Sequence, residues 1–516
     1  MTTRSTPAAS AAGKTAPRSG GTPDTGAGAG TGAEAGTGAG TGAGTGAGAA
    51  PEDPYALHPS DALDPPAGFR GTVRRLGPGM VLSAAVVGSG ELITTTALGA
   101  KAGFVLLWLV VISALVKVWV QIELARWTIL TGRTALSGYA RIGPRFGGRG
   151  RPDAGVGWIN VLWILMDFAK MLQRGGLIGG TAAACSILLP IGGAALSTTS
   201  LTVWTVIIVA VVIAMMYSGR YSAVERSAFV AVVVFTLVTV GLALGLPWTE
   251  FSYGGSELAS GLTFAIPAGT VGFAIAMFGI TGVGADEMTT YTYWCLEKGY
   301  ARWTGPDDGT EERARRAEGW IRVMRIDALL SWAVCTLCTL AFYVIGAAVL
   351  HPQGLVPQGN EMITTLSRVY TDTLGPWAHY LFLAGAIAVL FSTLVGSTAS
   401  VPRLWTNTLG LLGVIDWTDV RARRRTIRVL TVALPPLWAS FYLFIQSPVL
   451  MVQIGGVAGG IFLLAVVIAV WHLRASDVDA RFKRSKGLNA ALVASSTAIG
   501  VLGVYSVLEV FGLGLG

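Results

Sequence analysis

Long apolar stretches and short polar ones alternate along most of this chain. Each apolar stretch holds about 20 residues, the length that an α-helix needs to cross the hydrocarbon core of a membrane. The two-residue alternation that is typical of β-barrel strands is not found in the sequence. We therefore expect an all-α membrane protein with about 11 transmembrane helices, in windows at about 76–98, 104–130, 158–189, 200–218, 226–246, 268–294, 326–350, 376–400, 427–446, 449–472 and 489–512.

The composition agrees with this pattern and excludes several classes of function. Of the 516 residues, 52% are hydrophobic and 13% are charged, which excludes an ordinary soluble domain. The net charge of +8 lies mostly in short segments between the apolar windows, where membrane topology explains it, so we expect no nucleic-acid partner. We find no HExxH zinc motif and no nucleotide-binding motif, and we expect neither an enzyme nor a nucleotide-driven pump.

The N-terminal part of the chain has a different composition. A run of glycine, alanine and threonine is followed by a stretch rich in proline and aspartate, up to about residue 68. Neither segment can bury enough apolar surface to fold. We therefore predict a disordered cytoplasmic tail over residues 1–68.

The positions of the basic residues predict the orientation of the helices. The connections after the even-numbered windows hold most of the arginines and lysines, whereas the connections after the odd-numbered windows hold few. Positively charged connections remain on the cytoplasmic side of a membrane. We expect a multi-pass protein of the cell (plasma) membrane, with its N-terminus in the cytoplasm and its C-terminus outside.

An odd number of helices is compatible with an internal inverted repeat. Residues 69–250 and 251–475 would then form two five-helix halves of opposite orientation, and residues 476–516 an eleventh helix. The first window of each half is interrupted by glycines that lead into an acidic residue, at Gly88–Glu91 and at Gly282–Glu287. Broken helices at matching positions in two halves are the best indicator of a binding site at the membrane midplane.

The two interruptions combine groups that suit a cation. Glycines release backbone carbonyls from the helical hydrogen-bond pattern, and such groups persist in a membrane only where they line a cavity or bind a ligand. A carboxylate at this depth costs free energy unless it is paired, so its presence indicates a function. Carboxylate and carbonyl oxygens are the ligands that hard cations prefer. We expect a metal or substrate site formed by Ala85, Gly88, Glu91, Thr281, Gly284, Asp286 and Glu287.

Charged residues in the second and third windows allow another interpretation. Lys117 lies in the second window, and Asp167, Lys170 and Arg174 lie in the third. These residues could take part in coupling, or the three cations could neutralise the acids and leave an internal ion-pair network without a metal. Asp167 and Lys170 can also pair with one another, since they are three residues apart on one helix. The residues alone leave these alternatives open.

Several short sequences carry a resemblance to a known family. They are "GPGMVLSAAVV", "GFVLLW", "TGRTAL", "GRYSAVE" and "IDALLSW", in the same order as the windows. In these segments the chain resembles the Nramp family of divalent metal transporters. The resemblance implies a LeuT-like fold, a 5+5 inverted repeat with broken helices 1 and 6 and one extra C-terminal helix.

The residues that bind metal in the family are only partly retained. Gly88–Glu91 replaces the family's Asp-Pro-Gly-Asn of helix 1, and Gly284–Asp286 overlays on its Met-Pro-His of helix 6. The glutamine of helix 10 is retained as Gln453, which therefore joins the candidate site. The acidic pair that the family has on helix 3 overlays on Gln173 and Gly176. Hard carboxylate ligands in place of a thioether predict a weaker preference for transition metals and greater tolerance of Mg²⁺ or Ca²⁺.

These observations lead to one expected function and one alternative. We expect a secondary active transporter that moves a divalent metal cation of the Mn, Fe or Mg type by alternating access, together with H⁺ or Na⁺. The alternative is a symporter of LeuT-like fold that carries a small organic substrate, such as an amino acid, with Na⁺ or H⁺. Either protein would use the lipid bilayer and an ion gradient, and we expect no resident cofactor apart from the transported ion.

Overall fold

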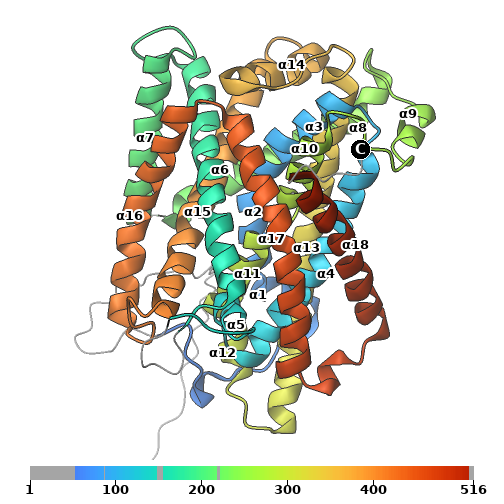
Figure 1. The fold of residues 1–516 in the computed structure, drawn as a ribbon. Helices are drawn as coiled ribbons and strands as arrows, with labels where there is room; N and C mark the ends of the chain where they lie inside the picture. Colours follow the sequence, from blue (N-terminus) through green and yellow to red (C-terminus); the bar gives the residue numbers. More distant parts are fainter. Residues whose placement is uncertain (1–52, 87, 148–154, 218–220, 511–516) are drawn as a thin grey trace, which may run out of the picture. The chain divides into compact units, whose positions relative to one another are not determined.

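The chain is described here by a computed structural model. It covers residues 53–86, 88–147, 155–217 and 221–510, without the side chains at 80, 84–86, 88–89, 221–231 and 510. These residues are helices and connecting turns, and their one β-type contact is an isolated bridge between Phe146 and Val156. All of them belong to one compact unit, Gly38–Gly516 (Figure 1).

Eight helical segments of the described chain are long and apolar enough to cross a membrane. They contain α4 (Leu107–Thr131), α7 (Thr198–Tyr217), α10 with α11 (Val271–Ile280 and Ala285–Lys298), α13 (Glu311–Ile345), α15 (Ala378–Leu411), α16 (Val420–Ile445), α17 (Pro448–Asp477) and α18 (Lys486–Val510).

The three other predicted windows are also helical. The first is divided into α2 (Pro78–Val86), η2 (Gly88–Thr95) and α3 (Thr96–Ala102), the third is α6 (Trp158–Leu188) and the fifth is α8 (Tyr221–Gly245). The all-α membrane fold is therefore confirmed. Short helices complete the described chain, namely η1 (Pro59–Asp61), α1 (Gly68–Arg75), α5 (Ala135–Tyr139), η3 (Leu246–Trp248), α9 (Gly255–Ser260), α12 (Tyr300–Thr304), η4 (Gly346–Leu350), η5 (Gly359–Glu361), α14 (Met362–Leu374) and η6 (Ala480–Lys483).

The two predicted interruptions have different conformations. In the sixth window the helix stops at Ile280 and restarts at Ala285, and Gly282 has a φ of +67°, which favours glycine. In the first window, η2 is a π-helix, which is a widened helix and not an extended segment. The hydroxyl of Thr95 donates to the carbonyl oxygen of Gly90, five residues earlier, at 2.9 Å. Residues Gly88–Thr95 of the first interruption therefore form a widened helix, and residue 87, between α2 and η2, lies outside the described residues.

Close helix contacts surround the second interruption. α17 packs along α6 and along α10, as their central positions in Figure 1 illustrate. A Cβ atom added at Gly279 of α10 would lie 1.8 Å from the carbonyl oxygen of Gly456 on α17, so only glycine permits this approach. Small residues at helix interfaces are typical of membrane proteins because they allow backbones to pack closely. The α10–α17 contact thereby fixes the end of α10 next to the interruption.

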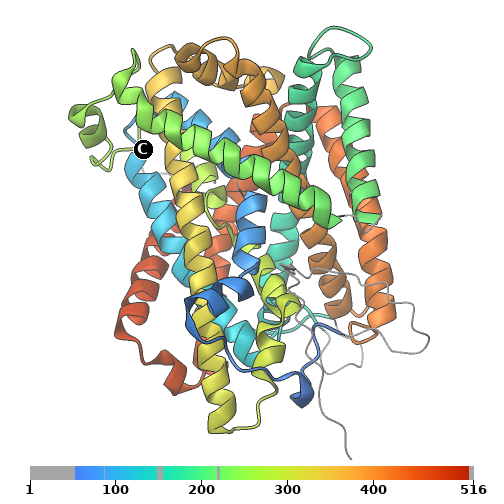
Figure 2. The same cartoon turned by 180° about the vertical axis from the view of Figure 1, so that it is seen from behind.

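The two predicted halves of the chain pack against each other. Figure 2 shows α8, the last helix of the first half, running obliquely across α13 of the second half, and α8 also contacts α15. The phenyl ring of Phe235 on α8 packs against the rings of Phe342, Tyr370 and Phe382. Aromatic contacts of this kind stabilise the interface between the halves.

The predicted boundary of the N-terminal tail at residue 68 is too late in the chain. Residues 1–52 lie outside the described part, but residues 53–67 contact several helices. The hydroxyl of Tyr55 donates to a carboxylate oxygen of Glu297 on α11 at 2.6 Å. The carbonyl oxygen of Leu63 accepts a hydrogen bond from the indole of Trp320 on α13 at 2.8 Å. An aromatic side chain and a backbone carbonyl provide these contacts, and the composition of the segment indicates neither of them.

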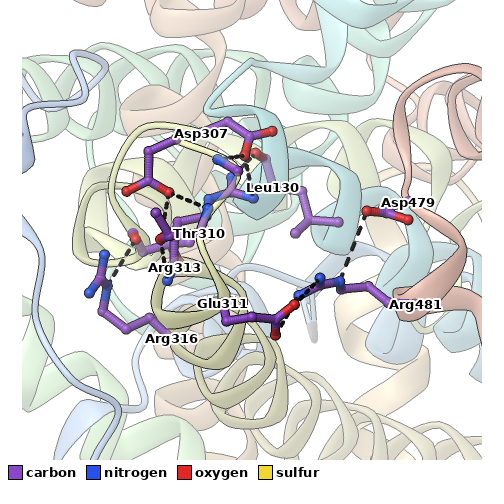
Figure 3. Close-up of polar contacts among 11 residues, drawn as sticks. Leu130, Asp307, Thr310, Glu311, Arg313, Arg316, Asp479 and Arg481 are labelled. Atoms are coloured by element: carbon purple, nitrogen blue, oxygen red, sulfur yellow. Dashed lines mark hydrogen bonds and ion pairs between the residues drawn. The ribbon is translucent and has the colours of Figure 1, made fainter.

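A polar network joins three connections at the ends of the long helices, as Figure 3 shows. The guanidinium of Arg313, in the first turn of α13, donates to the carbonyl oxygen of Leu130 near the end of α4 at 2.6 Å. Arg481, in the connection between α17 and α18, pairs with Glu311 at 2.7 Å. Thr310 caps α13 and also donates to Asp308, which lowers the pKa of that carboxyl. The network fixes the beginning of α13 against α4 and the α17–α18 connection.

Candidate functional site

The charged residues of α6 meet the acidic residues at the start of α11. The ammonium Nζ of Lys170 lies 2.6 Å from Oδ1 of Asp286 and 3.5 Å from Oε1 of Glu287. The guanidinium of Arg174 lies 2.8 Å from Asp167 and 3.5 Å from Asp286. Five charges from two helices therefore form one cluster in the interior of the protein.

Helical spacing places the three charged residues of α6 near one another. Residues at positions 167, 170 and 174 are separated by three and four residues, so they lie on one side of the helix. The local pair that we considered between Asp167 and Lys170 is replaced by other contacts. Asp167 binds Arg174 and accepts a hydrogen bond of 2.6 Å from the indole of Trp405 on α15. Lys170 is left to contact the acids of α11.

A polar cavity of about 40 Å³ adjoins this cluster. Asp286 and Glu287 remain partly exposed to it, whereas the side chain of Lys170 is only 1% exposed. A cavity of this size holds a few water molecules or a small ion. Its lining combines the charged residues with hydroxyl groups and apolar side chains, namely Val81, Leu82, Lys170, Gln173, Arg174, Leu177, Asp286, Glu287, Thr290, Trp294, Thr393, Gly396, Ser397, Ser400 and Val401.

Glu91 lies in a second polar group, between η2 and the interruption of the sixth window. Its side chain is fully buried, and Oε1 accepts hydrogen bonds from the backbone N–H of Gly282 at 3.1 Å and from the hydroxyl of Thr339 at 3.0 Å. The other carboxylate oxygen, Oε2, has no hydrogen-bond partner among the described residues. The structure thus connects the two predicted interruptions directly, through Glu91 and Gly282.

The carbonyl released at the end of α10 already has a cationic partner. The ammonium of Lys117 on α4 donates to the carbonyl oxygen of Thr281 at 2.7 Å, and it lies 5.0 Å from the centre of the Phe278 ring. A carbonyl at the C-terminal end of a helix attracts positive charge, so an ammonium is stabilised at this position. The carbonyl that we assigned to a bound cation is therefore occupied by a lysine in this structure.

The other predicted site residues have different surroundings. Gly284 is the last residue before α11. Gln453 is half-buried on α17 and is not among the residues that line the cavity, although its amide nitrogen is buried without a hydrogen-bond partner in the described chain. The side chain of Ala85 and the surroundings of Gly88 lie outside the described residues. The acidic residues of the candidate site lie in two groups, one at Glu91 and one at Asp286.

The charges of these two groups nearly balance. Four carboxylates, from Glu91, Asp167, Asp286 and Glu287, face three cations, from Lys117, Lys170 and Arg174. The formal sum is one negative charge. In the described residues no group of three or more acidic, histidine or cysteine side chains has the geometry of a complete metal site. A divalent ion that binds at Asp286 and Glu287 must therefore displace Lys170 or draw further ligands from backbone and hydroxyl groups.

Two polar residues of α13 were missed by the sequence analysis. Thr339 binds Glu91, as described above. Asp327 accepts hydrogen bonds from the N–H groups of Gly77 at 2.9 Å and Gly79 at 2.5 Å and from the hydroxyl of Tyr291 on α11 at 2.9 Å. It thereby holds the beginning of α2 to α11, which is part of the second broken helix. In the sequence, Asp327 is a single carboxylate within the apolar seventh window, and this could have indicated its role.

The chain was also compared with known proteins. The family model described as "Natural resistance-associated macrophage protein-like", named Nramp, matches residues 79–509. The chain is 27% identical over 366 residues to the divalent metal cation transporter MntH of Deinococcus radiodurans, covering 66% of this chain and 75% of that protein. It is 22% identical over 372 residues to an uncharacterized protein of Pasteurella multocida, covering 71% of this chain and 77% of that protein.

Solved structures support the same fold. A crystal structure of a variant of the manganese transporter of Eremococcus coleocola superposes with a TM-score of 0.60 at 16% sequence identity, covering 89% of this chain and 92% of that chain. At this level of identity the superposition shows that the two proteins share a fold. The family match spans most of the chain, from α2 to α18, and includes both helix interruptions. This protein belongs to the Nramp family.

Proposed function

We propose that this chain is a secondary active transporter that carries a divalent metal cation across the membrane by alternating access. Membership of the Nramp family supports metal ion transport and does not favour the alternative of an organic substrate. The observation that supports the site most strongly is the adjacent pair of carboxylates, Asp286 and Glu287, at the polar cavity beside the interrupted helix. The segments α2–η2 and α10–α11, which contain the two predicted interruptions, are the elements that we expect to move.

The chemistry of the cavity favours a hard cation. Its polar lining consists of carboxylate, hydroxyl, amide and cationic groups, and among the side chains that the structure describes no methionine, cysteine or histidine lines it. Mg²⁺, Mn²⁺ and Ca²⁺ prefer oxygen ligands, whereas sulfur ligands favour softer metals. We therefore place Mg²⁺, Mn²⁺ and Ca²⁺ ahead of softer metals as substrates of this protein.

The remaining parts of the proposal concern orientation and coupling. The distribution of basic residues supports a cytoplasmic N-terminus and an external C-terminus in the plasma membrane. The negative formal sum of the two groups at Glu91 and Asp286 supports the uptake of a positive ion, and H⁺ or Na⁺ is the proposed coupling ion. The charged groups at Glu91 and Asp286 form ion pairs and hydrogen bonds, and we assign no catalytic reaction to them.

The experiment is metal uptake by proteoliposomes that contain the full chain. Wild-type protein and the Asp286→Asn variant are compared for uptake of Mn²⁺, Mg²⁺ and Ca²⁺, with a pH-sensitive dye inside the vesicles. The control is Glu257→Gln, because Glu257 lies in the exposed helix α9 outside the cavity. We expect uptake of at least one of these metals by wild type and control, with a loss of at least about tenfold in Asp286→Asn. A folded wild type that takes up none of the three metals would contradict the proposal.

A further inference from the structure

Lys170 occupies the place where the proposed metal ligands converge. Its ammonium contacts both Asp286 and Glu287, at 2.6 and 3.5 Å, and its side chain is almost completely buried. The two acids are adjacent in the chain at the first turn of α11, while the lysine comes from α6. An ammonium ion held between two carboxylates has the position and the sign of charge of a bound metal ion.

The contact between Lys170 and Asp286 is a close ion pair. Nζ of Lys170 lies 2.6 Å from Oδ1 of Asp286, which is typical of a charge-assisted contact, and 3.5 Å from Oε1 of Glu287. Attraction between opposite charges therefore holds the ammonium at this place. A divalent cation carries twice the charge and can compete for the same two carboxylates.

The charge balance agrees with an exchange of cations at this point. With Lys170 in place, the four carboxylates of the two groups exceed the three cations of these groups by one formal charge. When the ammonium is left out of this sum, the excess is two negative charges, which equals the charge of one divalent cation. A divalent ion added beside Lys170 would instead produce a positive excess in the interior, which is unfavourable. The metal and the ammonium therefore fit the site one at a time.

We propose that Lys170 is a tethered competitor of the transported metal. Its ammonium occupies the seat between Asp286 and Glu287 while the site is empty of metal, and the metal must displace it to bind. This inference rests on the proposed transport of a divalent cation and adds a residue that sets its affinity. The displaced ammonium could move within the same cavity toward Ser397 and Ser400, which line it. The competition would weaken binding and speed the release of the metal.

The test is a titration of the purified full chain with Mn²⁺ by isothermal calorimetry. The variants are Lys170→Met, which removes the ammonium, and Lys170→Arg, which keeps a positive charge. Lys101→Met is the matched control, because it removes the same charge from an exposed position at the end of α3. We expect Lys170→Met to bind Mn²⁺ at least about tenfold more tightly than wild type, since close charge pairs are coupled by this amount or more. Lys170→Arg and Lys101→Met should remain within about threefold of wild type.

A second variant and a second measurement distinguish a change in metal affinity from misfolding of the variant. In Lys170→Met the two carboxylates have lost a cation, so added Mn²⁺ should raise its unfolding temperature by more than that of wild type. Replacing Asp286 by asparagine in the same variant should remove the gain in affinity. A wild type that binds Mn²⁺ while folded Lys170→Met binds it equally or more weakly would overturn this inference and leave the proposed function intact. If neither protein binds Mn²⁺, Mg²⁺ or Ca²⁺, both proposals fail.

Discussion

The ammonium of Lys117 donates a hydrogen bond of 2.7 Å to the carbonyl oxygen of Thr281, the first residue of the interrupted segment between α10 and α11. The two residues are 164 positions apart in the chain. A lysine of the second window thus satisfies the carbonyl that the interruption of the sixth window releases. This contact gives the interrupted helix a partner when no metal is bound.

Replacing Lys117 by methionine should destabilise the protein. The substitution leaves the Thr281 carbonyl without its donor in a buried environment, which costs about 1–3 kcal/mol. We expect a lower unfolding temperature in detergent, measured by a thermal shift assay. Lys486→Met serves as the control, since this side chain is exposed at the beginning of α18. Equal unfolding temperatures for wild type and Lys117→Met would show that the contact contributes nothing to stability.

Replacing Glu91 by glutamine removes the charge of the side chain but can retain its hydrogen bonds, so the variant tests the role of the charge. The amide oxygen of glutamine can still accept from the N–H of Gly282 and from Thr339, so the protein should fold. The loss of one negative charge makes the buried groups neutral in sum, and we expect metal uptake to fall at least about tenfold. Uptake by proteoliposomes and the unfolding temperature are measured on the same preparation. Unchanged uptake would remove Glu91 from the functional site.

Thr339→Val should affect stability through the same contact. Valine has nearly the same shape but cannot donate, so the buried Glu91 carboxylate loses one of its two partners. A hydrogen bond to a charged group contributes about 1.5–3 kcal/mol. The expected result is a lower unfolding temperature than wild type, and the double variant Glu91→Gln with Thr339→Val should lose less than the sum of the single variants. Additive losses would contradict a direct interaction.

Gly279→Ala should disrupt the contact between α10 and α17. The added Cβ would lie 1.8 Å from the carbonyl oxygen of Gly456 and 2.5 Å from the backbone nitrogen of Gly460, and neither backbone can move freely. Overpacking of this kind costs about 3 kcal/mol. Gly272→Ala on the same helix is the control, because its Cβ would meet nothing within 4 Å. The elution profile in size-exclusion chromatography and the unfolding temperature are measured for Gly279→Ala and Gly272→Ala. Equal profiles and equal unfolding temperatures would contradict the described packing.

Tyr55→Phe tests the contacts of the N-terminal segment 53–67. The variant loses the hydrogen bond to Glu297 but keeps the ring that packs on Trp417 and beneath the guanidinium of Arg423. A hydrogen bond to a charged carboxylate contributes about 1.5–3 kcal/mol, and removing the ring in Tyr55→Ala should cost more. We expect the unfolding temperature to decrease in the order wild type, Tyr55→Phe, Tyr55→Ala. If Tyr55→Ala unfolds at the temperature of wild type, the segment does not stabilise the helices.

The helices and the second interruption could be predicted from the sequence because they depend on local properties. Apolar length predicts a membrane helix, and glycine with a positive φ at position 282 allows the chain to leave the helix. The first interruption was only partly anticipated. Residues Gly88–Thr95 form a π-helix, which is a helix with a wider turn, and the hydroxyls of Thr95 and Thr96 bind carbonyls five residues earlier.

The partners of the charged side chains could not be predicted in the same way. Lys170 could pair with Asp167 by its spacing on α6, yet the packing of α15 places Trp405 beside Asp167 and leaves Lys170 facing α11. Thr339 lies 248 residues from Glu91 in the chain. No local pattern indicates contacts over such separations, because they arise from the packing of whole helices. The charged residues could be selected from the sequence as candidates, whereas their partners can be read only from the structure.

Anomalous diffraction from crystals of the full chain grown with Mn²⁺ would show directly where the metal binds. We expect an anomalous peak between Asp286 and Glu287, at about 2.0–2.6 Å from carboxylate oxygens, with the ammonium of Lys170 moved away from them. If Lys170 still contacts both acids while Mn²⁺ binds elsewhere, or does not bind at saturating concentration, Asp286 and Glu287 do not form the metal site.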